Sequence, residues 1–109
     1  MNLSSKVFET KIVKEKQPSV LVFGANWSGN SEMMDSLMER VSKEFEEDIN
    51  FYKVDIEEQE DISAFLGVFN VPTTIMIKDG EVKEFIKGFL PAGKMRRKIE
   101  ETYSTTESI

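Results

Sequence analysis

The chain has 109 residues, of which 39% are hydrophobic and 31% charged, and its formal net charge is −6. This length and composition predict one domain, residues 1–109, with a core large enough to fold without metals or disulfide bonds. The acidic balance excludes generic binding to nucleic acid or an anionic membrane, and no apolar run approaches the roughly 20 residues of a membrane span.

The first half of the chain alternates helical and strand patterns. Residues 1–15 mix lysine and glutamate with apolar positions and lack the apolar stretch of a secretory signal, so we expect a cytoplasmic protein. The apolar spacing then predicts four elements in chain order. They are a helix over 7–16, a strand over 19–23 buried on both faces, a helix over 30–47 and a strand over 49–56.

The second half of the chain contains a hairpin. A short helix is predicted over 61–66, ending near Gly67. Strands over 73–78 and 82–87 are joined at Asp79-Gly80, a dipeptide typical of tight hairpins. A last helix follows over 91–102, and residues 103–109 are predicted to fray. This order predicts an α/β fold with a mixed central β-sheet flanked by helices on both faces.

Four motifs carry a resemblance to a known family. Residues 23–31, with the sequence FGANWSGNS, resemble the F-x-A-x-W-C-G-P-C active-site turn of the thioredoxin family. Lys53-Val54-Asp55 resembles its central strand, Asn70-Val71-Pro72-Thr73 its cis-proline turn, and Lys87-Gly88-Phe89 the end of its terminal hairpin. The four motifs occur in register, and the resemblance covers the chain from Ser5 to Thr102, so it implies the thioredoxin fold.

The departures from this family concern its chemistry. Ser28 and Ser31 stand where the family has its attacking and resolving cysteines, and Asn30 replaces a proline. Val22 stands where thioredoxins bury an acid, so Lys53, the usual neighbour of that acid, is expected to be an ordinary half-exposed strand residue. A thiolate can attack a disulfide and leave again, whereas a serine hydroxyl cannot. No thiol–disulfide activity is therefore expected.

Serine catalysis is also disfavoured, because the chain contains neither histidine nor cysteine. A serine nucleophile needs a general base, and the usual zinc ligands are missing as well. We therefore expect no catalytic residue, no metal and no cofactor. Instead, Ser28 is predicted to cap the following helix and Ser31 to fill its first turn. The acidic residues around 55–61 lack the pattern of a calcium loop and are predicted to form a solvated face.

The resemblance also implies a peptide-binding groove. In thioredoxins such a groove holds an extended peptide beside the cis-proline, partly through backbone hydrogen bonds, and this mode needs no sulfur. Trp27 is predicted to be exposed, and Met33 to lie at the groove edge. The residues expected around the groove are Trp27, Gly29, Asn30, Ile56, Val71, Pro72, Gly88 and Phe89.

Three functions remain open from the sequence. The first is a binding or scaffold protein without thiol chemistry, a monomer or weak dimer that holds a protein or peptide partner in the groove. The second is a disulfide oxidoreductase whose cysteines at positions 28 and 31 were replaced by serine. The third is a structural subunit that forms a homo-oligomer through a sheet edge or the groove.

Overall fold

Four strands and the helices around them make up residues 2–104, the part of the chain that this computed structural model describes. The chain begins with α1 (Ser5–Val7), which continues directly into the π-helix η1 (Phe8–Lys14). The remaining elements are β1 (Ser19–Gly24), α2 (Gly29–Ser42), β2 (Asn50–Asp55), α3 (Glu60–Leu66), β3 (Thr73–Lys78), β4 (Glu81–Lys87) and α4 (Ala92–Tyr103). None of the helices in this part of the chain is long and apolar enough to cross a membrane.

The strands form a mixed sheet in the order β2-β1-β3-β4. β1 pairs in parallel with β2 and antiparallel with β3, and β3 pairs antiparallel with β4. Every residue of the central strand β1 is buried, as its uninterrupted apolar run predicts.

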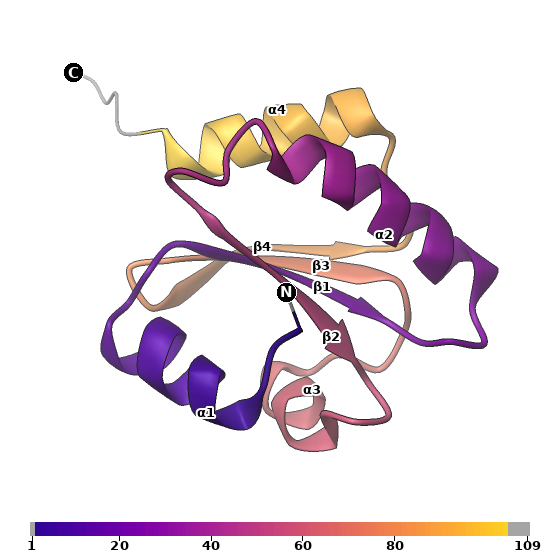
Figure 1. The fold of residues 1–109 in the computed structure, drawn as a ribbon, viewed down its shortest axis with the longest axis horizontal. Coiled ribbons are helices and arrows are strands. Elements are labelled where there is room, and N and C mark those ends of the chain that lie inside the picture. Colours follow the sequence, from indigo (N-terminus) through magenta and orange to yellow (C-terminus); the bar gives the residue numbers. More distant parts are fainter. Residues whose placement is uncertain (1, 105–109) are drawn as a thin grey trace.

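Helices cover both faces of the sheet (Figure 1). Alternate residues of β1 point to opposite faces, so Val20 and Val22 join one core cluster while Leu21 and Phe23 join the other. The first cluster lies under α2 and α4, and the second lies under the initial helices and α3. The predicted α/β architecture of the thioredoxin fold is confirmed.

Two helices differ from the prediction. The first begins earlier, at Ser5, where the Ser4 hydroxyl caps it by accepting a hydrogen bond from the Val7 backbone N–H. Helix α2 ends at Ser42, and the residues up to position 48 form turns instead of continuing to position 47 as predicted. This segment carries four carboxylates, which the negative end of the helix dipole disfavours.

Tyr103 differs from the prediction, which places it in a fraying tail. Instead it is the last residue of α4, and its hydroxyl lies 2.7 Å from the Ser19 carbonyl oxygen and 3.1 Å from the Ile77 carbonyl oxygen. The phenol thus ties α4 to β1 and β3. The rest of the predicted tail, from residue 105 onward, lies outside the described residues.

Both edges of the sheet carry features that hinder pairing with another sheet. Asn2 forms a β-bridge to Lys53 on the β2 edge, and the Leu3 N–H donates to the Lys53 carbonyl oxygen at 2.9 Å. The β4 edge has a register shift opposite residues 76 and 77, and it carries Lys83 and Lys87. Bulges and lysines are devices that protect an edge strand from addition of another strand.

Candidate functional site

The residues predicted from the four motifs meet at one end of the sheet. β1 and β2 are parallel and β3 runs the other way, so the ends of β1, β2 and β4 lie beside the start of β3 (Figure 1). Two backbone hydrogen bonds join these connections: the Ile56 N–H donates to the Gly24 carbonyl oxygen at 3.1 Å, and the Gly88 N–H donates to the Pro72 carbonyl oxygen at 2.8 Å. The topology thus brings together segments far apart in the sequence.

Ser28 is the N-cap of α2. Its backbone is extended, and its Oγ accepts a hydrogen bond from the Ser31 N–H at 3.2 Å. The Ser28 carbonyl oxygen accepts from the Ser31 N–H at 3.1 Å and from the Glu32 N–H at 3.3 Å, which begins the helical hydrogen-bond pattern. The Glu32 carboxylate lies in the first turn, where it complements the positive end of the helix dipole. The predicted capping role is confirmed.

Ser31 is a buried residue of the first turn. Only 3% of it is exposed, and its Oγ accepts a hydrogen bond from the Ala25 N–H at 3.3 Å. A Cβ added to Gly24 would lie 3.1 Å from the Ser31 Cβ, so the glycine lets the start of α2 approach the end of β1 closely. The predicted packing role of Ser31 is therefore confirmed.

Neither serine has the surroundings of a nucleophile. The chain contains no histidine, and the hydrogen bonds at the two hydroxyls join them to backbone N–H groups. A catalytic serine would need a base that removes its proton. Among residues 2–104 there is likewise no cluster of three or more carboxylates that could hold a metal ion.

Lys53 is a half-exposed strand residue as predicted, but it has an ionic partner that the sequence interpretation did not include. Val22 is buried under α2 and supplies no acid, but the Lys53 Nζ lies 2.9 Å from the Asp35 Oδ2 of that helix. Lys53 therefore has a partner, although not one from its own sheet. The sequence pattern could not reveal this ion pair, because it depends on how α2 crosses β2.

The predicted groove residues differ in how far they reach the surface. Trp27 is 67% exposed, and its Nε1–H donates to the Glu57 Oε2 at 3.3 Å. Phe89 is 40% exposed and Met33 is 54% exposed. Gly29 and Asn30 are also exposed.

The other residues predicted for the groove are less exposed. Pro72 is buried, and the peptide bond before it is cis, as the motif implies. Ile56, Val71 and Gly88 are half-buried, and Ile56 packs against the core cluster under α3. We call the exposed set Trp27, Met33 and Phe89 the turn surface.

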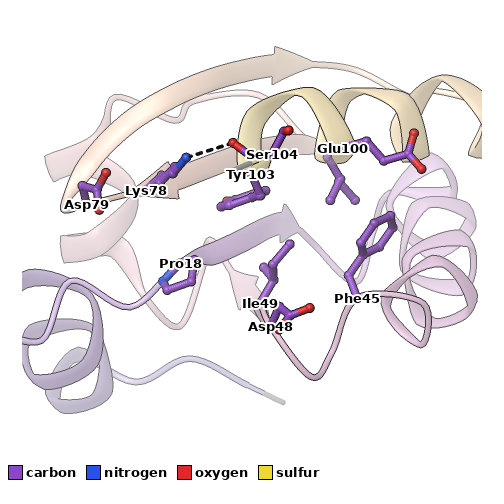
Figure 2. A pocket seen from close by; sticks show the side chains of 10 residues that line it. Pro18, Phe45, Asp48, Ile49, Lys78, Asp79, Glu100, Tyr103 and Ser104 are labelled. Atoms are coloured by element: carbon purple, nitrogen blue, oxygen red, sulfur yellow. Dashed lines mark hydrogen bonds between the residues drawn. The ribbon is translucent and has the colours of Figure 1, made fainter. Parts of the chain in front are cut away.

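The cavities do not coincide with the turn surface. One of about 130 Å³ lies beside the turn, between Gly24, Asp35 and Lys53. A cavity of about 620 Å³ lies at the opposite end of the sheet, where Phe45, Ile49 and Tyr103 line it (Figure 2). The residues of the turn surface line neither of these two cavities.

Comparison with known proteins shows that the chain is similar to thioredoxins. A family model described as Thioredoxin matches residues 1–101. The chain is 41% identical over 91 residues to a thioredoxin of Borreliella burgdorferi, which covers 78% of this chain and 77% of that protein. It is 31% identical over 99 residues to chloroplastic thioredoxin M4 of Arabidopsis thaliana, covering 91% of this chain and 51% of that protein. It is 28% identical over 98 residues to a thioredoxin of Chlorobaculum thiosulfatiphilum, covering 90% and 91%.

Proposed function

The chain belongs to the thioredoxin family but contains no cysteine, and from this premise we propose that it binds a protein or peptide partner without thiol chemistry. The partner contacts the turn surface and lies beside Pro72. The observation that carries the proposal is the 67% exposure of Trp27 at the end of the sheet where the four motifs meet.

The exposed aromatic side chains support a binding role. Trp27 and Phe89 offer large apolar areas at little conformational cost, and aromatic residues of this kind dominate the energetics of many interfaces. The hydrogen bond from the Trp27 indole to Glu57 restrains the ring before a partner arrives. A restrained side chain loses less entropy on binding, so this arrangement favours recognition.

The serines support the same conclusion. Ser28 caps α2 and Ser31 packs against Gly24, so both side chains have structural roles in the turn. The scaffold of the turn is therefore maintained by hydrogen bonds that need no sulfur. By the family resemblance, an extended segment lying beside Pro72 would bind through its own backbone and through apolar side chains on the turn surface.

A display experiment tests this proposal. A phage library of random peptides is selected on the purified protein, and the enriched peptides are then measured against two variants. The double variant Trp27→Ala/Phe89→Ala removes the exposed rings, while Val82→Ala truncates an exposed apolar side chain at the opposite end of the sheet. We expect peptides that bind the wild type and Val82→Ala alike and lose at least about tenfold in affinity for the double variant.

The proposal fails if no peptide is enriched, or if the enriched peptides bind the double variant as well as they bind the wild type. An insulin disulfide-reduction assay with a thioredoxin as positive control provides a separate check. The wild-type chain is expected to give no acceleration over reductant alone, because it has no thiol to exchange.

A second candidate is an oxidoreductase whose two cysteines were replaced by serine. The position of Ser28 favours it, because the N-cap of a helix is where a thiolate is stabilised and its pKa lowered. Sequencing the native gene across codons 28–31 decides the origin of the serines. If cysteine codons are found, the variant Ser28→Cys/Ser31→Cys is expected to reduce insulin, and an inactive variant would contradict this candidate.

A further inference from the structure

Two further large apolar side chains are exposed on the connection from β2 to β3. Phe65 is 75% exposed and Phe69 is 78% exposed, although large aromatic side chains are normally buried in a monomer. Phe65 lies at the end of α3 and contacts Phe8 edge-on, with the ring centroids 6.1 Å apart. No part of the sequence pattern predicted that these two rings would face solvent.

A hollow lies beside Phe65. It has a volume of about 510 Å³ and lies between the initial helices and α3, and its lining includes Lys6, Phe8, Val13, Asp61 and Phe65. Val13 is itself 48% exposed. An apolar side chain of a partner could therefore be accommodated here, next to a carboxylate.

The connection that carries these aromatic rings is strongly acidic. From Val54 to Ile77 the chain contains no lysine or arginine, and it has five acidic residues: Asp55, Glu57, Glu58, Glu60 and Asp61. Among residues 2–104, none of the five forms an ion pair with a lysine or arginine. Their charge is therefore available to an approaching partner.

Contacts join this acidic run to the turn surface. Glu57 accepts the hydrogen bond from the Trp27 indole, and the Asp55 Oδ1 accepts from the Glu57 N–H at 2.8 Å. α3 begins at Glu60 and spans seven residues, or about 10 Å, and Phe65 is its sixth residue. The acidic run thus connects Glu57, which contacts Trp27, to α3, which carries Phe65. We call Trp27, Phe65, Phe69 and the five acidic residues the aromatic acidic face.

We infer that the partner is a peptide segment that carries apolar side chains and several lysines or arginines, and that it binds across the aromatic acidic face. This inference rests on the proposed function and specifies the chemistry of its partner. The apolar side chains contact the exposed rings and the hollow beside Phe65, while the basic groups approach the unpaired carboxylates. Charges of opposite sign at an interface raise the association rate and disfavour acidic competitors.

The test compares two fluorescein-labelled peptides by anisotropy. Both consist of leucine, phenylalanine and serine, and one has lysine where the other has glutamate. We expect the lysine peptide to bind at least about tenfold more tightly at about 0.05 M salt, and the difference to shrink at about 0.5 M salt because exposed charges are then screened. Because Trp27 is the only tryptophan, its emission should shift to shorter wavelength as the lysine peptide covers it.

Two charge variants test whether the position of the carboxylates matters. Glu57→Gln/Glu58→Gln/Glu60→Gln removes three carboxylates of the face, and Glu46→Gln/Glu47→Gln/Asp48→Asn removes three exposed carboxylates of the turns after α2. The two variants have equal net charge, so a difference between them reports position. The first variant should lower the affinity for the lysine peptide roughly tenfold, because it removes three weak charge contacts with the peptide. The second variant removes no such contact, so it should lower the affinity by less than about twofold.

Equal weakening by both variants would overturn the inference, because the peptide would then respond only to net charge. Equal binding of the lysine and glutamate peptides would also overturn it. If that equal binding were still lost in Trp27→Ala/Phe89→Ala, the proposed function would stand and only the basic character of the partner would be refuted. Binding of neither peptide would refute the inference, and the display selection would still decide the proposed function.

Discussion

The substitution Ser28→Ala tests whether this serine is a structural cap. In the structure its Oγ accepts the Ser31 N–H at 3.2 Å, and the Ser28 carbonyl oxygen shares that donor at 3.1 Å. Loss of an N-cap typically costs about 1 kcal/mol, within a range of about 0.5–2. Because the donor is shared and the distance is long, we expect the lower half of that range, about 0.5–1 kcal/mol.

Urea unfolding followed by circular dichroism measures this cost. Ser28→Asp serves as a matched variant, since aspartate caps a helix equally well and its charge complements the dipole, so stability should be unchanged or higher. Ser36→Ala is the control within the same helix, where an exposed serine becomes the best helix former and stability should rise by up to about 0.5 kcal/mol. The capping argument is refuted if Ser28→Ala is as stable as the wild type or if Ser28→Asp loses as much as Ser28→Ala.

Two further substitutions test interactions that hold the sheet and helices together. Tyr103→Phe removes the hydroxyl that bonds to backbone carbonyl oxygens of β1 and β3, and it should lower the free energy of unfolding by about 1 kcal/mol in urea. Burial raises the pKa of Tyr103 above its ordinary value of 10.0, so the unfolded chain releases this proton first. The wild type should therefore lose stability as the pH rises above about 10, and Tyr103→Phe should lose less over the same range. Asp35→Asn removes the partly exposed ion pair with Lys53 and should cost less than about 1 kcal/mol, with the difference vanishing at high salt; a larger cost would show that this pair is not an ordinary surface contact.

The sequence predicted most of the architecture because local patterns and global topology agree in this chain. The apolar run over 19–23 made the buried central strand recognisable, and the Asp79-Gly80 turn set the hairpin. The end of α2 was misplaced because apolar periodicity continues to Phe45, which packs against the core from a turn instead of from a helix. Periodicity alone does not distinguish these two ways of burying a side chain.

The candidate site was predicted in part. Ser28, Ser31 and the exposure of Trp27 followed from motif positions, since caps and turn residues have local signatures. The Asp35–Lys53 ion pair and the Trp27–Glu57 hydrogen bond were not predicted, because each joins residues from different elements. The exposed Phe65 was also missed, because a short apolar helix does not reveal which of its side chains the neighbouring elements leave uncovered.

Amide chemical-shift mapping by NMR tests the central claim most directly. The protein labelled with ¹⁵N is titrated with the most enriched displayed peptide, and the perturbed residues are located on the structure. A thiol-free binding protein of the kind proposed should show its largest shifts at Trp27, Val71, Gly88 and Phe89. Shifts confined to the cavity at the opposite end of the sheet, near Phe45, Ile49 and Tyr103, would contradict the account.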